Sequence, residues 1–232
     1  MYADVFKRVI DFCLSLLALI VLSPFFLILV LAGTIAMRGN PFFVQPRPGR
    51  KGTDGKEIIF YLIKFRTMDN KTDAQGRMLP DEKRLNAYGR FLRTTSADEL
   101  PSLVNILIGD MAIVGPRPQL VRDMVFMTEE QRRRHTVRPG LTGLAQVNGR
   151  NNISWEEKFE YDLMYIDRGI TLRGDACIIL KTVGKVLSRR DIVRDGTASD
   201  MDYGDWLVSE GKLDRTEYAE GQKKAKDLLG IR

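Results

Sequence analysis

The sequence of 232 residues predicts an α+β protein that is mainly helical. Three observations lead to this prediction: an apolar run over residues 9–37, a β-hairpin pattern over residues 42–68, and helical patterns in the second half of the chain. The apolar run is long enough to enter a lipid bilayer. We therefore divide the chain into a membrane segment (1–38), a main domain (39–195) and a polar, partly helical tail (196–232).

The apolar run carries Ser23 and Pro24 near its centre, in the letters LSPFF. As one straight helix the run would measure about 43 Å, against about 30 Å for the hydrocarbon core of a bilayer. Pro24 cannot donate a helical hydrogen bond, so a kink is expected, and the Ser23 hydroxyl can donate to a carbonyl that is left free. Lys7 and Arg8 precede the run and Arg38 follows it, and basic residues favour the cytoplasmic side. A re-entrant helix–break–helix and a single kinked spanning helix both remain open.

The next segment predicts a β-hairpin. β-forming residues at Phe42–Gln45 and Ile58–Phe65 flank a turn-rich stretch from Pro46 to Gly55. After a polar loop, apolar residues at helical spacing over 100–107 predict a helix that ends at Gly109. A short buried strand, MAIV, and a stiff loop, GPRP, are expected to follow that helix.

Two further amphipathic helices are expected, over 155–167 and about 172–189. Ser154 and Glu157 have the spacing of a capping box, which begins the first of these helices. One face of each helix is apolar, and such a face packs either into a protein core or into the plane of a membrane surface. The pattern alone leaves both alternatives open.

Charge and histidine content limit the kinds of partner. The chain has a net charge of +6 and a pI near 9.3, which favours anionic partners. No module with interleaved aromatic and basic residues is recognisable, so phosphorylated substrates or membrane lipid are expected and nucleic acid is not. His135 is the single histidine, which excludes sites built from several histidines. Any metal must then be held by carboxylates, which suits Mg²⁺ or Mn²⁺.

Asp98 and Glu99, in the letters SADELPSL, form the first candidate site. An ionised Asp beside a metal-binding Glu can attack phosphorus and form a covalent aspartyl intermediate. The alternative is structural, because Ser96 and Glu99 have capping-box spacing and acidic residues are favoured in a first helical turn. Pro101 complicates that alternative, since proline is better placed at the start of a helix. Spacing alone favours the structural alternative.

Basic residues form the other candidate sites. Arg117 lies between two prolines in GPRP, so a stiff loop presents its guanidinium in a way that suits bidentate phosphate binding. A plain surface turn explains the same residue equally well. Lys64 and Arg66 lie two residues apart on a predicted strand and therefore share a face. The glycine-rich stretch 137–151 allows close approach of backbone to a ligand. Its polar residues include Arg138, Asn148 and Arg150.

The order of these motifs resembles the monotopic phosphoglycosyl transferases, which are bacterial sugar transferases, and in particular their small PglC type. The resemblance covers about residues 2–195 and is most specific over 91–151. It rests on FKRVID, the apolar run with Ser-Pro, QPRPG, KFRTM, RFLRTTSADELPSLVNILIGDMAIVGPRP, RPGLTGLAQVNGRN and WEEKFEYDLMYI.

The resemblance implies transfer of a phosphosugar from a UDP-sugar to a polyprenyl phosphate such as undecaprenyl phosphate. UMP and a polyprenyl diphosphate-sugar are the products, in the first membrane step of glycoconjugate biosynthesis. Asp98 corresponds to the nucleophile of a ping-pong mechanism with a covalent aspartyl–phosphosugar intermediate. Glu99 corresponds to the ligand of a Mg²⁺ cofactor. Lys64, Arg117 and Arg150 correspond to basic residues that bind the substrate.

The resemblance also favours a re-entrant membrane segment with its bend at Ser23 and Pro24. Both termini would then lie on the cytoplasmic face of the bacterial inner membrane, and the later amphipathic helices would lie at the membrane interface around the active site. The choice of UDP-sugar, the pathway, the role of 196–232 and the oligomeric state, a homodimer included, are left open. The alternative function is a membrane-bound phosphohydrolase of nucleotide or lipid diphosphates.

Overall fold

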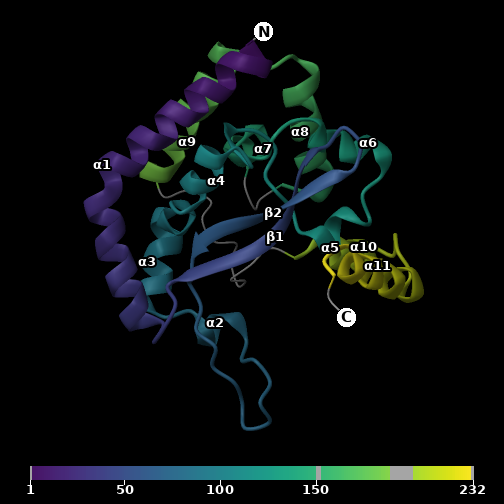
Figure 1. Cartoon of the computed structure of the whole chain (residues 1–232). Helices are drawn as coiled ribbons and strands as arrows, with labels where there is room; N and C mark the ends of the chain where they lie inside the picture. The colour runs from purple at the N-terminus through teal and green to yellow at the C-terminus, as the bar shows by residue number, and fades with distance from the viewer. Residues whose placement is uncertain (1, 150–152, 189–200, 231–232) are drawn as a thin grey trace.

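The computed structural model describes residues 2–149, 153–188 and 201–230, and it is mainly helical around a small antiparallel hairpin (Figure 1). The predicted α+β class with many helices is therefore confirmed. The helices are α1 (Lys7–Ala36), α2 (Asp81–Arg84), α3 (Ala87–Thr95), α4 (Ser102–Ile108), α5 (Val121–Met124), α6 (Glu129–Arg132), α7 (Leu144–Asn148), α8 (Trp155–Asp167), α9 (Leu172–Ser188), α10 (Tyr203–Ser209) and α11 (Arg215–Leu228). The strands are β1 (Phe42–Lys51), β2 (Glu57–Phe65), β3 (Ala112–Val114) and β4 (Gly140–Thr142). Short helical turns are η1 (Tyr2–Phe6), η2 (Ala97–Glu99) and η3 (Arg133–Thr136).

The hairpin of β1 and β2 is the centre of the domain. Its register places Phe42 opposite Phe65 and Pro48 opposite Ile59. The predicted turn from Pro46 to Gly55 is too long, because β1 continues through both prolines to Lys51. A two-stranded sheet consists of edge strands only, so a proline that lacks an N–H can be accommodated on the unpaired side.

The apolar run forms one helix, α1, and the predicted interruption at Ser23 and Pro24 is absent. The Ser23 hydroxyl donates to the carbonyl of Ile20 at 2.7 Å. That carbonyl is the one that an N–H at position 24 would otherwise bind, so the predicted compensation by Ser23 is confirmed. The helix therefore passes through the proline, and Figure 1 shows that α1 changes direction along its length.

Buried polar contacts fix α1 to the rest of the protein. Lys7 forms an ion pair with Asp175 of α9 at 2.6 Å, and both side chains are buried. Arg8 donates to the last carbonyls of α4 at 2.6 and 2.7 Å. Farther along the helix, the Tyr88 hydroxyl of α3 donates to the carbonyl of Leu29 at 2.8 Å. Both halves of α1 are thus held in a defined position relative to the domain.

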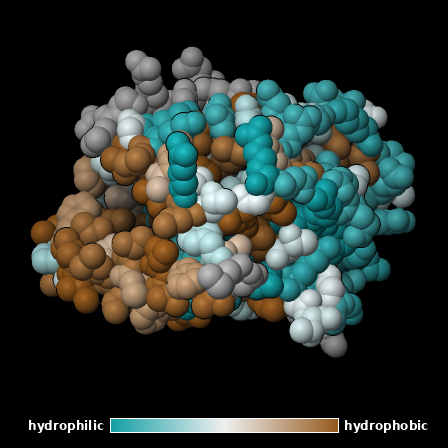
Figure 2. All heavy atoms as spheres, turned by 90° about the horizontal axis from the view of Figure 1, so that it is seen from above, coloured by the Kyte–Doolittle hydropathy of each residue, from teal (hydrophilic) through white to brown (hydrophobic). Residues whose placement is uncertain are grey.

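The outer face of α1 is apolar and exposed. Among the described residues, α1 is the one helix that is long and apolar enough to cross a membrane, and only 11% of its most apolar window is buried. Figure 2 shows the corresponding apolar surface gathered on one side of the molecule, with hydrophilic residues on the opposite side. The exposed apolar side chains of α1 include Val9, Phe12, Leu16, Leu17, Ile20, Val21, Leu27, Ile28, Leu31 and Ile35.

The inner face of α1 helps to cover the hairpin. One core cluster joins Phe60 and Leu62 of β2 to Ile106 of α4, with Leu19 of α1 packed against it. A second cluster joins Phe65, Leu92 and Ala97 to Leu29 of α1. The predicted helix at 100–107 and the strand MAIV correspond to α4 and β3, and both predictions are confirmed. Gly109 ends α4 with a φ of 103°, a conformation that favours glycine.

The two later amphipathic helices differ in what their apolar faces contact. The capping box of Ser154 and Glu157 is present, and α8 begins at Trp155, directly after Ser154. Trp155 and Phe159 of α8 are buried, so this face belongs to the core. The apolar stripe of α9 lies largely at the surface, where Leu172 and Val183 are exposed.

The predicted tail is helical and packs against the domain. The rings of Phe126 and Tyr218 stack at a centroid separation of 5.7 Å, and Tyr203 of α10 packs against Trp155 at 5.2 Å. Gly221 lies so close to Phe126 that a Cβ there would meet the ring at 2.2 Å. α10 and α11 are therefore firmly joined to α5 and α8 (Figure 1).

The approach of α3 to the end of β2 leads to a prediction on stability. A Cβ added at Gly89 would lie 1.9 Å from the carbonyl oxygen of Thr67, and backbone cannot move away cheaply. We expect Gly89→Ala to lower the free energy of unfolding by about 1–3 kcal/mol, as overpacking does. Gly184→Ala in α9 is the matched control, because its Cβ would meet nothing within 4 Å. Thermal unfolding in detergent tests this, and equal melting temperatures for the two variants would contradict it.

Candidate active site

The acidic pair lies on the 3₁₀ turn η2, between α3 and α4. Ser96 has a φ of 56° and makes no capping hydrogen bond with its side chain, so the capping-box alternative is wrong. Pro101 instead occupies the position before the first residue of α4, where its missing N–H costs nothing. The Asp98 and Glu99 side chains are thereby released from a capping role.

Glu99 is held by two cations from distant segments. Its Oε1 accepts hydrogen bonds from Lys64 Nζ of β2 and from an Arg117 guanidinium nitrogen, both at 2.7 Å, and its Oε2 lies 3.4 Å from the other terminal nitrogen of Arg117. Burial alone would raise the pKa of Glu99, but Arg117 and Lys64 together outweigh it and hold this pKa well below its usual range. Glu99 is therefore an ionised carboxylate in a fixed position. Burial lowers the pKa of Lys64, although Glu99 opposes that shift.

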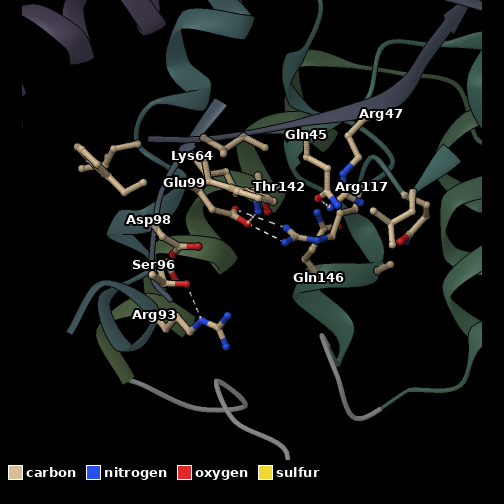
Figure 3. A pocket seen from close by; sticks show the side chains of 18 of the residues that line it. Gln45, Arg47, Lys64, Arg93, Ser96, Asp98, Glu99, Arg117, Thr142 and Gln146 are labelled. Atoms are coloured by element: carbon tan, nitrogen blue, oxygen red, sulfur yellow. Dashed lines mark hydrogen bonds and ion pairs between the residues drawn. The ribbon is translucent and has the colours of Figure 1, made fainter. Parts of the chain in front are cut away.

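Asp98 has a different environment. Among the described residues, none donates a hydrogen bond to its carboxylate. Burial, and then the charge of Glu99, raise the pKa of Asp98, while Lys64, Arg117 and Arg93 partly offset the rise. Figure 3 shows Asp98 facing the same space as Glu99 and Arg117, with Ser96 and Arg93 on its other side. Asp98 is a partly buried carboxylate that is surrounded by cations and bonded to none of the described residues, which suits a nucleophile.

The GPRP loop holds Arg117 firmly, as its two prolines predict. The buried Arg134 donates to the carbonyl of Arg117 at 2.7 Å, and Arg47 donates to the carbonyl of Pro118 at 3.1 Å. The carbonyl of Pro116 accepts the N–H of Gly140 at 2.9 Å. Arg117 is therefore a preorganised cation at the site.

These residues line a cleft with a volume of about 1070 Å³. Lys64, Asp98, Glu99 and Arg117 all line it, so the structure brings together four of the five residues predicted to act on the substrate. Arg150, the fifth, lies outside the described residues. Sequence reasoning did not assign several other residues of the cleft to the site, and these include Arg47, Arg93, Asp123, Gln146, Asp162 and Asp202.

Some of these residues could have been found from the sequence and others could not. Arg47 lies between two prolines in QPRPG, which is the same pattern that drew attention to Arg117. Arg93 and Gln146 carry no such signal, because only the fold brings them to the cleft. Of the other residues in the glycine-rich stretch, Arg138 donates to the carbonyl of Gly109 at 2.8 Å and Asn148 donates to the carbonyl of Leu144, so the described contacts of both are structural.

The described residues hold no cluster of three or more His, Cys, Asp or Glu side chains suited to a metal ion. Asp98 and Glu99 are neighbouring carboxylates that line the cleft together with Lys64, Arg93 and Arg117. This donor set fits Mg²⁺, which is commonly bound through one or two carboxylates together with substrate phosphates and waters. It does not fit a site built from protein ligands alone.

Comparison with known proteins identifies the family. The model of the bacterial sugar transferase family matches residues 2–189. The chain belongs to this family. It is similar to the uncharacterized sugar transferase EpsL of Bacillus subtilis, with 44% identity over 79% of this chain and 88% of the relative. The resemblance that the sequence motifs indicate is thereby confirmed, and the protein is a bacterial sugar transferase.

Two further relatives carry informative names. The chain is 38% identical to the UDP-glucose:undecaprenyl-phosphate glucose-1-phosphate transferase of Klebsiella pneumoniae, over 78% of this chain and 40% of the relative. It is 34% identical to the exopolysaccharide production protein ExoY of Sinorhizobium fredii, over 79% of this chain and 86% of the relative. The family match ends at residue 189, before α10 and α11 begin.

The contrast between the two acidic residues leads to a prediction on stability and pH. Glu99→Gln removes the anion that pairs with Lys64 and Arg117, so it should lower the free energy of unfolding by about 1–3 kcal/mol. Asp98→Asn should raise it, because the wild-type carboxylate is desolvated and has no described donor.

The pH dependence follows from the raised pKa of Asp98 in the folded state. Ionisation of that carboxyl destabilises the folded protein. The free energy of unfolding of Asp98→Asn therefore exceeds that of the wild type most at pH 8, and the difference becomes smaller as the pH falls toward 5. Thermal unfolding of both proteins at pH 5 and pH 8 measures this difference. An Asp98→Asn variant that melts below the wild type at pH 8 would contradict this account.

Proposed function

We propose that the protein transfers a phosphosugar from a UDP-sugar to undecaprenyl phosphate or a related polyprenyl phosphate. The observation that carries the proposal is an Asp98 carboxylate without a described donor, beside a Glu99 that Lys64 and Arg117 hold in place. Two relatives support this reaction by their names, a UDP-glucose:undecaprenyl-phosphate glucose-1-phosphate transferase and an undecaprenyl-phosphate galactose phosphotransferase. UMP and a polyprenyl diphosphate-sugar are the products, at the first membrane step of glycoconjugate assembly.

The reaction proceeds in two displacements. An oxygen of Asp98 attacks the phosphorus that carries the sugar, and the bond from that phosphorus to the oxygen bridging the two phosphates breaks. The electron pair leaves with UMP. An oxygen of the polyprenyl phosphate then attacks the same phosphorus, the bond to Asp98 breaks, and the carboxylate is regenerated. A covalent intermediate lets UMP leave before the lipid arrives.

The cationic part of the cleft suits both steps. Lys64, Arg117 and Arg93 surround Asp98, and cations at fixed positions stabilise the charge that develops on transferring phosphoryl groups. Arg150 is a further candidate for substrate binding by resemblance. Glu99, with Asp98, would hold Mg²⁺ together with the substrate diphosphate, where the ion would offset charge on the leaving phosphate.

The apolar surface supports attachment to a membrane, and we propose the cytoplasmic face of the inner membrane as its place. α1 is exposed along its outer side, and Leu180 and Val183 add exposed apolar surface on α9. Val183 and Phe43 also line the cleft, so the polar site and an apolar surface meet at its edge. A lipid acceptor with its phosphate at the headgroup plane fits such an edge. We propose that α1 is re-entrant, with its bend near Ser23 and Pro24 and both ends on the cytoplasmic side.

The covalent step has a direct test. Incubation of the wild type with a radiolabelled UDP-sugar and no acceptor should release one UMP per protein and leave label on the chain. Asp98→Asn should reduce UMP release by about 1000-fold or more, as the loss of a catalytic nucleophile does, and should take up no label. Mass spectrometry of peptides locates the label.

Asp205→Asn is the matched control, because Asp205 on α10 does not line the cleft. It should be labelled like the wild type, and removal of Mg²⁺ by EDTA should abolish labelling in both. UMP release that continues for many turnovers without an acceptor would favour the phosphohydrolase instead. Full activity of Asp98→Asn would contradict the covalent mechanism.

The topology of α1 has its own test. Single cysteines at Tyr2 and Asn40, placed in a background without Cys13 and Cys177, should both react with a membrane-impermeant maleimide in inside-out vesicles. Neither should react in intact spheroplasts, because both ends of a re-entrant helix lie on the cytoplasmic side. Reaction of the two cysteines from opposite sides would establish a spanning helix.

A further inference from the structure

The cleft extends beyond the cations around Asp98 into a region that is rich in hydrogen-bond acceptors. Three segments contribute carboxylates to it: Asp123 of α5, Asp162 of α8, and Asp202 just before α10. Gln146 of α7 lines the same cleft. Since the family match ends at residue 189, Asp202 comes from a part of the chain that the family model does not include.

The segment that carries Asp202 is fixed in place. Asp123 Oδ1 accepts the backbone N–H groups of Tyr203 at 2.9 Å and Gly204 at 3.4 Å, so it caps α10 from another helix. Asp202 forms an ion pair with Arg122, the neighbour of Asp123. The indole N–H of Trp155 donates to the carbonyl of the preceding residue, Met201, at 3.2 Å. Because four contacts hold this segment, Asp202 is preorganised to bind a ligand.

Polar atoms in this region lack partners. Asp162 is 2% exposed, its Oδ2 pairs with Arg134 at 2.5 Å, and its Oδ1 is buried without a hydrogen bond among the described residues. Both amide atoms of Gln146 are likewise buried and unbonded in the described part of the chain. Buried polar groups are nearly always hydrogen-bonded in proteins, so such atoms in the wall of a cleft indicate a bound ligand or ordered water.

The charge of this region selects the kind of ligand. The carboxylates here are compensated by nearby cations, because Asp202 pairs with Arg122, Asp162 pairs with Arg134, and Arg47 interacts with Asp123. The phosphates are instead attracted to Lys64 and Arg117 around Asp98. Carboxylates and an amide instead suit hydroxyl groups, which donate hydrogen bonds without adding charge. Burial, and then the charge of Asp202, raise the pKa of Asp123 to about 6.

We propose that Asp123, Asp162, Asp202 and Gln146 bind a neutral, hydroxyl-bearing ring of the donor, so that the segment before α10 helps to determine donor specificity. This inference rests on the proposed function, because the donor supplies both the phosphates and the ring. Two rings of a UDP-sugar have this chemistry, the ribose and the transferred sugar. The segment is a specificity element that the family domain alone does not contain.

The test compares two aspartates near the same helix. Asp202→Asn changes a cleft residue, whereas Asp205→Asn changes a residue that accepts from the Tyr218 hydroxyl at 2.6 Å and does not line the cleft. We expect Asp202→Asn and Gln146→Ala each to raise the donor KM by about 3- to 10-fold, the effect of one lost hydrogen bond. The KM for undecaprenyl phosphate should not change, and Asp205→Asn should behave as the wild type.

The readouts distinguish the two rings. If the ribose is bound, inhibition by UMP weakens by the same factor as donor binding, and all UDP-sugars are affected alike. If the transferred sugar is bound, UMP inhibition stays at the wild-type value and the factor differs among UDP-glucose, UDP-galactose and UDP-N-acetylglucosamine. Unchanged donor KM in both cleft variants, or an equal change in Asp205→Asn, would overturn the inference.

Titration calorimetry with the same UDP-sugars separates this inference from the proposed reaction. A wild type that binds a UDP-sugar but never releases UMP defeats the proposed reaction, while the effect of the two variants on binding still tests the subsite. A wild type that binds none of these donors overturns both.

Discussion

Glu99 connects three separate parts of the chain at the floor of the cleft. It lies on the η2 turn, and it receives Lys64 from β2 and Arg117 from the GPRP loop. A 3₁₀ turn has about three residues per turn, so neighbouring side chains diverge by about 120°. Asp98 therefore faces the same cleft as Glu99 without joining the ion pairs that hold Glu99. The consequence is a difference between the two carboxylates: two cations fix the position of Glu99, while Asp98 is bonded to none of the described residues.

The position of α1 follows from a second set of polar contacts. Asp175 receives Lys7 at 2.6 Å and the hydroxyls of Tyr2 and Tyr165 at 2.9 and 2.8 Å. These contacts join the beginning of α1 to α8 and α9, while the apolar clusters join its inner face to the hairpin. The outer face is left free for lipid. The same helix that would contact the membrane therefore also fixes the position of the η2 turn, through Leu29 and its neighbours, relative to that membrane.

The cleft combines two electrostatic environments in one cavity. Lys64, Arg117 and Arg93 lie around Asp98, whereas Asp202 and Asp162 near α10 and α8 are paired with Arg122 and Arg134. Arg47 interacts with charges of both environments. Burial and then Arg117 lower its pKa to about 10, while Asp123 and Asp202 oppose the shift. A donor with a charged diphosphate and neutral rings matches such a distribution. Met201 and Asp202, just before α10, take part in this arrangement although the family model does not extend to them.

Much of this protein is determined by local sequence. Apolar length defines α1, the Ser154–Glu157 box begins α8, Gly109 ends α4, and flanking prolines stiffen Arg117, because each of these effects acts over a few bonds along the chain. Motif order was also sufficient for the family and for Asp98 and Glu99 as candidates.

Only the tertiary structure decided the rest. Whether Glu99 caps a helix or pairs with Lys64 depends on a strand 35 residues away, which no local pattern can reveal. Whether a proline interrupts an apolar helix depends on the packing that supports it, and α1 has that support on its inner face. The apolar faces of α8 and α9 look alike in sequence, yet that of α8 is buried and that of α9 lies largely at the surface. Asp202 reaches the cleft only because Asp123 and Trp155, distant in sequence, hold its segment there.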